Sequence, residues 1–155
     1  MRENLWQTLK DYSSEYIFNC DETGLFWKIK LSRTISNGQV SGTKQSKDRV
    51  IVLLTCNVTG TKKLAPLFIH KYENPRAIKN INKKTLPVDY YWNQKSWMQV
   101  SIWNEYIKKL NTRMRRQDQN ILLLVDNALT HTLYDTTYLT NITIKHLSPN
   151  TTVHL

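Results

Sequence analysis

Two aspartates stand where a carboxylate could do chemistry. Asp21 and Asp126 each follow directly on an apolar run that is typical of a strand, 16–20 and 121–125. A carboxylate at the rim of a buried strand is costly unless it is paired or holds a cation. Oxygen ligands on a rigid sheet suit Mg²⁺ or Mn²⁺. Two such ions, about 3.5–4 Å apart, can activate a nucleophilic oxygen and stabilise the leaving oxygen of a phosphodiester.

The same aspartates have a simpler interpretation. An Asp that follows a strand commonly caps the next helix, and the stretch 21–24 (DETG) also suits a turn. Spacing alone slightly favours capping for each residue taken singly. Because both aspartates occur on one basic chain, the preference for capping over metal binding becomes smaller, but it does not disappear. The residue pattern therefore leaves both interpretations open.

The elements that must position these residues follow from hydrophobic periodicity. The predicted elements are a helix over 1–12, strands over 16–20, 49–57 and 64–71, a helix over 99–113, and strands over 121–125 and 142–147. Residues 28–47 are expected to form a long loop, and residues 75–94 are expected to be irregular. This order predicts an α/β fold with a mixed sheet, in which three antiparallel strands precede two strands joined by helical crossovers. Ligands of such sheets bind at the carboxyl ends of parallel strands, so Asp21 and Asp126 would share one edge if their strands are parallel neighbours.

Composition limits the class of protein and of partner. The chain has 155 residues, 40% of them hydrophobic, which suits one globular domain with its own core. Its apolar runs are too short for a transmembrane helix, and its first residues lack the apolar core of a secretory signal, so we expect a soluble protein. The net charge is +10, and the stretch 28–84 holds 13 basic residues against two acids. Such a concentration suits a polyanion such as nucleic acid, or equally a solubilising face.

Five blocks of sequence carry a more specific signal. They are IFNCDETGLFWKIKLSRTI, KDRVIVLLTCNVTGTKKLAPLFIHKYENPR, LPVDYYWNQKSWM, ILLLVDNALTH and HLSPNTT. Together they resemble, in order and spacing, the DDE superfamily endonucleases and transposases of the pogo/Tigger/centromere-protein-B-like (jerky-like) branch. The resemblance implies an RNase H-like fold, an α/β structure with a mixed five-stranded sheet of three antiparallel and then two parallel strands, with flanking helices. On this basis residues 1–14 form a lead-in helix and residues 15–155 form the catalytic core.

The resemblance also implies a site. Asp21 matches the first catalytic acid of the family and Asp126 the second, and both bind divalent metal, with two Mg²⁺ or Mn²⁺ ions in the complete family site. The family uses them for phosphodiester hydrolysis and strand transfer on DNA. Its third acid lies on a helix shortly after the block that matches 149–152, whereas this sequence ends at Leu155. No residue can be assigned to the third acid, and the C-terminal helix is expected to be missing.

Several other residues have both a functional and a structural interpretation. His131 matches a histidine of the family's second block and could contact phosphate or the attacking water, or could simply be a polar residue at a helix start. Lys28, Lys30 and Arg33 could contact the DNA backbone, or could belong to a flexible charged loop. Glu22 should alternate away from Asp21 if the strand extends that far.

Aromatic and sulfur side chains are expected to serve mainly in packing. Helical spacing places Trp103 in the core, and Trp92 and Trp97 are more often packing residues than platforms for bases. Cys20 and Cys56 are expected to fill space within strands.

Two hypotheses about function follow. In the first, the chain is an enzyme that cleaves DNA with divalent metal; in the second, it is a catalytically inactive, truncated or co-opted DNA-binding remnant of a transposase. Whether the chain is active depends on the third acid. In both cases the expected partner is DNA, the expected location is the nucleus, a homodimer is possible, and neither a membrane nor a small-molecule substrate is expected.

Overall fold

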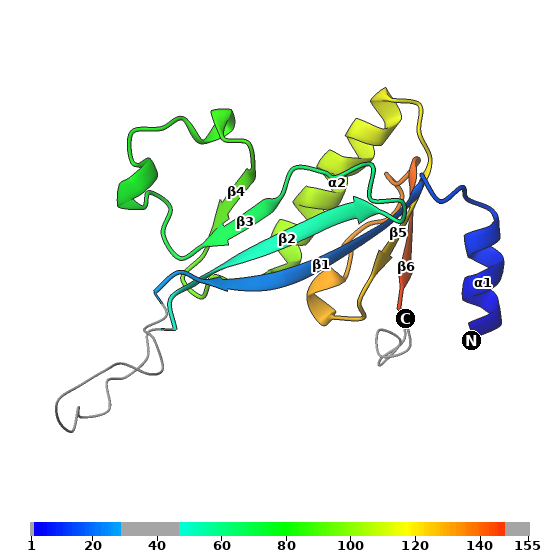
Figure 1. The fold of residues 1–155 in the computed structure, drawn as a ribbon, viewed down its shortest axis with the longest axis horizontal. Coiled ribbons are helices and arrows are strands. Elements are labelled where there is room, and N and C mark those ends of the chain that lie inside the picture. Colours follow the sequence, from blue (N-terminus) through cyan, green and yellow to red (C-terminus); the bar gives the residue numbers. More distant parts are fainter. Residues whose placement is uncertain (1, 29–46, 148–155) are drawn as a thin grey trace, which may run out of the picture.

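A six-stranded mixed sheet organises the chain in the computed structural model, which describes residues 2–28 and 47–147. The strands lie in the order β4-β3-β2-β1-β5-β6 (Figure 1). The helices and strands are α1 (Arg2–Lys10), β1 (Ile17–Phe26), β2 (Arg49–Asn57), β3 (Leu67–His70), β4 (Asp89–Trp92), α2 (Val100–Arg116), β5 (Ile121–Val125) and β6 (Ile142–His146). Short 3₁₀ turns occupy Arg76–Ile78, Lys83–Thr85 and Leu129–His131.

The strand directions confirm most of the predicted topology. β1 pairs with β2, and β2 with β3, in antiparallel fashion, while β5 lies parallel to both β1 and β6. The prediction of five strands is wrong, because Asp89–Trp92 forms β4, parallel to β3. This segment (DYYW) is rich in strand-forming aromatic residues, but it is only four residues long and its partner is distant in sequence. Periodicity could not detect it, since pairing with β3 rather than a local pattern stabilises it.

Strand β1 is longer than its sequence predicts. It runs past Cys20 to Phe26, and its second half pairs with β2 as far as Phe26↔Arg49. The stretch 21–24 is therefore extended, and the interpretation of these residues as a turn is wrong. Pairing with the strongly strand-forming β2 explains the extension, because each residue of this half gains a partner on β2.

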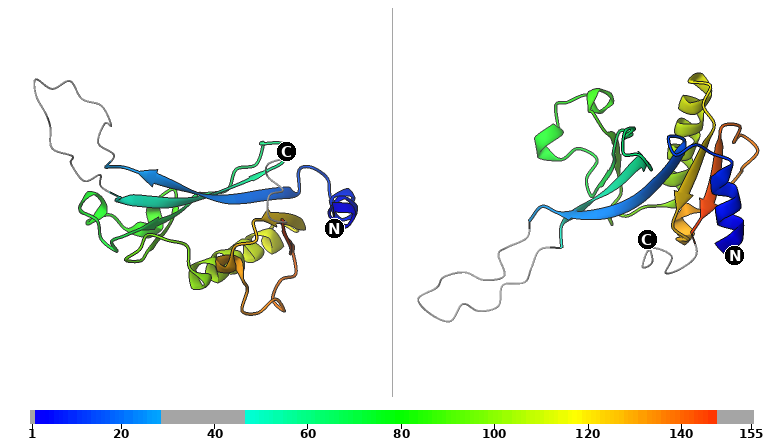
Figure 2. Two further views of the ribbon diagram at one scale, coloured as in Figure 1. Left: turned by 90° about the horizontal axis from the view of Figure 1, so that it is seen from below. Right: turned by 45° about the vertical axis from the view of Figure 1, so that its right-hand side comes forward.

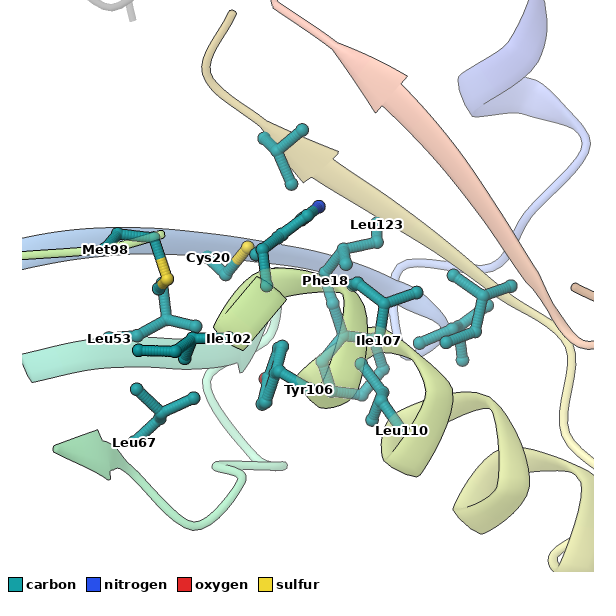
Figure 3. Packing of buried hydrophobic residues seen from close by; sticks show 14 of the residues in the cluster. Phe18, Cys20, Leu53, Leu67, Met98, Ile102, Tyr106, Ile107, Leu110 and Leu123 are labelled. Carbon is teal, nitrogen blue, oxygen red and sulfur yellow. The ribbon is translucent and has the colours of Figure 1, made fainter. Parts of the chain in front are cut away.

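Helix α2 covers one face of the sheet and forms the core with it (Figure 2). Six apolar side chains of α2 at helical spacing are buried, as predicted: Ile102, Trp103, Tyr106, Ile107, Leu110 and Met114. They meet inward-facing residues of five strands, including Phe18, Leu53, Leu67 and Leu123 (Figure 3). Alternation along each strand then decides which polar residues face α2 and which face away.

The remaining elements lie at the margins. Helix α1 lies near β6 (Figure 2), and the Tyr12 hydroxyl hydrogen bonds the Thr143 hydroxyl at 2.9 Å. No helix within residues 2–28 and 47–147 is long and apolar enough to cross a membrane. Most of the loop expected over 28–47 lies outside the described residues, as does the expected loss of a C-terminal helix.

Candidate metal and nucleic-acid site

The register of two strands brings Asp21 and Asp126 to neighbouring positions. β1 and β5 pair in parallel as far as Asn19↔Leu124. Asp21 and Asp126 each come two residues after this last pair, the relation expected for acids on parallel neighbours. Cys20 lies buried beside them, and its pKa is raised by burial and then by the charges of Glu22, Asp21 and Asp126. Three carboxylates thus gather where β5 ends beside the middle of β1.

Each aspartate carboxylate accepts a hydrogen bond from the backbone through one oxygen. Asp21 Oδ1 accepts a hydrogen bond from the backbone N–H of Glu22 at 2.8 Å. Asp126 Oδ1 accepts one from the backbone N–H of Ala128 at 3.2 Å, which is the local contact that the capping interpretation requires. The side chain of Asp126 nevertheless remains 57% exposed. Both carboxylates can therefore still reach a ligand from solvent.

His131 lies beneath this edge and connects two of the acids. Its side chain is only 2% exposed, and its ring packs on Trp103 with 4.3 Å between ring centroids. Nε2 lies 2.9 Å from Glu22 Oε1, and Nδ1 lies 2.5 Å from Asp126 Oδ1. Burial opposes the charge of the ring, but the hydrogen bond to Glu22 and the charges of both acids outweigh it and raise the pKa of His131. Both nitrogens face acceptors, which only the doubly protonated imidazolium can satisfy at once.

His131 and Glu22 have surroundings that the sequence did not predict. His131 ends a 3₁₀ turn rather than beginning a helix, and its nitrogens face protein carboxylates instead of solvent. Glu22 does alternate away from Asp21, as predicted, but its contact with His131 was missed. The signal was available: Glu22 follows Phe18 and Cys20 on the inward face of β1, where a carboxylate needs a partner.

The donor set at this edge suits a hard divalent cation. Mg²⁺ in proteins commonly takes one or two carboxylates and fills its other positions with waters and phosphate oxygens. Asp21 and Asp126 offer such oxygens, while Glu22 and His131 already satisfy one another. Within the described part of the chain, no group of three or more His, Cys, Asp and Glu side chains could hold a metal ion. Asp21 and Asp126 thus supply at most two carboxylates for such an ion.

Basic and aromatic side chains gather around β3 and β4 and the residues that follow β1. The lysine–aromatic surface, as we call it, consists of Trp27, Lys28, His70, Lys71, Tyr72, Lys83 and Tyr90. His70 stacks between Trp27 and Tyr90, with ring centroids 6.4 Å away on each side. Lysine ammonium groups lie over three of the rings, at 4.4 Å for Lys28 and Trp27. The surface combines positive charge with flat apolar faces.

This surface and Asp21 belong to the same face of the sheet. Thr23, two residues after Asp21, stands opposite Val52, which stands opposite Phe68, which stands opposite Tyr90. Since cross-strand partners point the same way, Tyr90 shares the face of Asp21 and not that of α2.

Of the three basic residues predicted to contact DNA, the structure describes only Lys28. Lys28 belongs to the lysine–aromatic surface and pairs with Asp48 at 3.0 Å. Lys30 and Arg33 lie outside the described residues, so their predicted DNA contacts are not placed.

Among the tryptophans and cysteines expected to serve in packing, some side chains are buried and others are exposed. Trp103 is fully buried and Cys20 is buried, both as predicted. Trp92 and Trp97 are about half exposed, and their assignment to packing rather than to base stacking stays a prediction. Cys56 is exposed as well, because its side chain points away from the buried face of β2.

Comparison with known proteins identifies the family of this architecture. The family described as "DDE superfamily endonuclease" matches residues 47–155. The chain is 36% identical over 128 residues to the human (Homo sapiens) Jerky protein homolog, covering 77% of this chain and 23% of that protein. It is 34% identical over 125 residues to Tigger transposable element-derived protein 4 of Mus musculus, covering 79% and 24%. It is 33% identical over 142 residues to the major centromere autoantigen B of Mus musculus, covering 90% and 23%.

The relatives agree with the pogo/Tigger/centromere-protein-B-like branch predicted from the sequence blocks. The chain spans about a quarter of the length of these curated relatives. Among solved structures, the Mos1 transposase paired-end complex with left transposon end is similar with a TM-score of 0.51. That likeness covers 92% of this chain and 38% of that one at 16% identity. It confirms the predicted RNase H-like fold.

Proposed function

Since this chain belongs to the family of DDE superfamily endonucleases, we propose that it binds DNA and supplies two of the acids for metal-dependent phosphodiester cleavage. The observation that carries the proposal is the parallel pairing of β1 with β5, whose last pair, Asn19↔Leu124, comes two residues before Asp21 and Asp126. In this proposal residues 15–155 form the catalytic core and residues 1–14 lead into it. The proposed location is the nucleus, where a DNA substrate would be found.

Asp21 and Asp126 are the residues that would hold Mg²⁺ or Mn²⁺. Such an ion, when bound, polarises a phosphoryl oxygen and makes a bound water more acidic. The protein's own contribution is to fix the two carboxylates. A backbone N–H holds Asp21, and a backbone N–H together with His131 orients Asp126. Because Glu22 holds the other nitrogen of His131, the ring cannot rotate away without breaking a buried contact.

The lysine–aromatic surface is the proposed contact for the DNA backbone. Lysines there can neutralise phosphates, and the binding free energy would then depend on the release of counterions. The adjoining acids would meet the same strand, because the surface shares the face of Asp21. We expect affinity for duplex DNA to fall steeply with salt and to depend little on base sequence, since phosphate contacts carry no sequence information.

Plasmid nicking tests the proposal. Supercoiled plasmid is incubated with the chain and Mn²⁺, beside Asp21→Asn, Asp126→Asn and the control Asp118→Asn. Asp118 lies after α2 with φ of 51°, a conformation that Asn adopts readily, so this control removes one carboxylate with little strain. We expect wild type and the control to nick, and the two site variants to retain DNA without nicking it. Equal nicking by all four would contradict the assignment of the acids, whereas DNA retention without any nicking would support the inactive remnant instead.

A further inference from the structure

A small aromatic-lined pocket opens beside Glu22 on the face of the sheet that α2 covers. Glu22, Gly24 and Phe26 line it from alternate positions of β1, and Arg49 lines it from β2. Trp97, just before α2, completes the wall. We call this cavity of about 290 Å³ the Trp97 pocket. Its rings are accessible, since Trp97 is 51% exposed and Phe26 39% exposed.

Arg49 occupies an unusual position in the Trp97 pocket. Its guanidinium lies 4.8 Å from the ring centroid of Trp97 and 5.9 Å from that of Phe26. Its Nε is buried and has no hydrogen-bond partner among the described residues. A buried donor without an acceptor carries a free-energy cost, which a ligand or a small rearrangement upon binding could remove.

Chemistry narrows the class of ligand. Glu22 disfavours a phosphate or another anion in the pocket, and Arg49 disfavours a cation. A neutral, flat ring with hydrogen-bond acceptors suits both, because it can stack on Trp97 and Phe26 and accept from Arg49. The cavity is at the small end of ligand pockets, which favours a single ring system over a base pair.

We propose that the Trp97 pocket receives one unpaired nucleobase of the bound DNA. This inference rests on the proposed DNA-binding function. The base would leave the stack, as it must for its faces to contact aromatic side chains. Glu22 joins the pocket to the site, since the same side chain bonds His131, which contacts Asp126. Glu22 and Phe26 face α2 rather than the side of Asp21, so the base would enter around the edge of β1, whose pairing with β5 ends at Asn19↔Leu124.

Three short DNA ligands test the proposal: a fully paired duplex, the same duplex with one extra unpaired 2-aminopurine, and the same duplex with an abasic residue at that point. Affinity is measured by anisotropy of an end label, and stacking by the quenching of 2-aminopurine emission. We expect wild type to bind the 2-aminopurine duplex roughly tenfold more tightly than the other two, a typical effect of stacking one base on an aromatic side chain.

Variants assign that preference to the pocket. Trp97→Ala should abolish both the preference and the quenching while leaving affinity for the paired duplex unchanged. Gly24→Val should do the same with both rings in place, because a side chain there would fill the space beside Phe26 and Arg49. The control Trp92→Ala removes a similarly exposed tryptophan of β4 outside the pocket and should keep the preference.

The outcomes separate the two proposals. Equal affinity of wild type for all three ligands, or a preference that survives both Trp97→Ala and Gly24→Val, would overturn the base pocket alone. Failure to bind even the paired duplex would overturn the proposed function, and the base pocket with it.

Discussion

The cluster of Glu22, His131 and Asp126 and the cluster of Glu105, Lys109 and Tyr91 both include charged groups joined by short contacts. In the first, the His131 ring is almost fully buried against Trp103, which belongs to α2. In the second, Lys109 bonds Glu105 at 2.8 Å and the Tyr91 hydroxyl at 2.7 Å, but the Lys109 and Glu105 side chains are each 53% exposed.

The difference in exposure predicts a difference in energetic weight. Water screens the charges of the Lys109 cluster, and such pairs typically contribute less than about 1 kcal/mol. Removing the buried ring of His131 leaves Glu22, whose side chain is only 22% exposed, without its counter-charge, and breaking such a largely buried pair typically costs about 3–5 kcal/mol, whereas the 57% exposed Asp126 stays in contact with water. Substitutions in the His131 cluster should therefore lower the free energy of unfolding more than substitutions in the Lys109 cluster on the outer side of α2.

The largest effect is expected for His131→Ala. The change removes the partner of Glu22 and of Asp126 and leaves a cavity under Trp103, so the free energy of unfolding should fall by about 3 kcal/mol. Urea denaturation followed by circular dichroism measures it. A loss below about 1 kcal/mol would mean that the His131 cluster is no more important than the exposed one.

A much smaller effect is expected for Lys109→Ala, below about 1 kcal/mol and weaker still in high salt. The hydrogen bond from Lys109 is the main cause that lowers the pKa of Glu105. A group whose pKa is lowered by folding contributes stability above its unfolded pKa, about 4.3 for Glu, and loses it as the pH falls further. The difference between wild type and variant should therefore shrink in acid. Urea midpoints at neutral pH and near pH 3 test this, and a difference that grows in acid would contradict it.

Sequence reasoning succeeded where the signal was local. The apolar stripe of α2 and the continuous run of β5 predicted both elements and the burial of Trp103, because burial on one or two faces leaves a regular pattern. The assignment of Asp21 and Asp126 as site acids, which rests on their position after apolar strands and on the resemblance to a family, stays a prediction.

What the sequence did not reveal depends on contacts between distant residues. β4 exists because it pairs with β3, and β1 continues past Asp21 because β2 lies beside it. The contact of Glu22 with His131 joins positions 109 residues apart, so no spacing rule could indicate it. The ring of the half-exposed Trp97 faces Arg49 across the pocket, a contact that no local pattern indicates.

The central claim is that Asp21 and Asp126 together hold a divalent cation, and Mn²⁺ binding tests it without relying on cleavage. Electron paramagnetic resonance measures free Mn²⁺ during a titration of wild type, Asp21→Asn, Asp126→Asn and the control Asp118→Asn. We expect wild type and the control to bind with the same Kd, and each site variant to bind at least about tenfold more weakly, because each removes one of two anionic ligands. Unchanged affinity in both site variants would show that these carboxylates do not form a metal site.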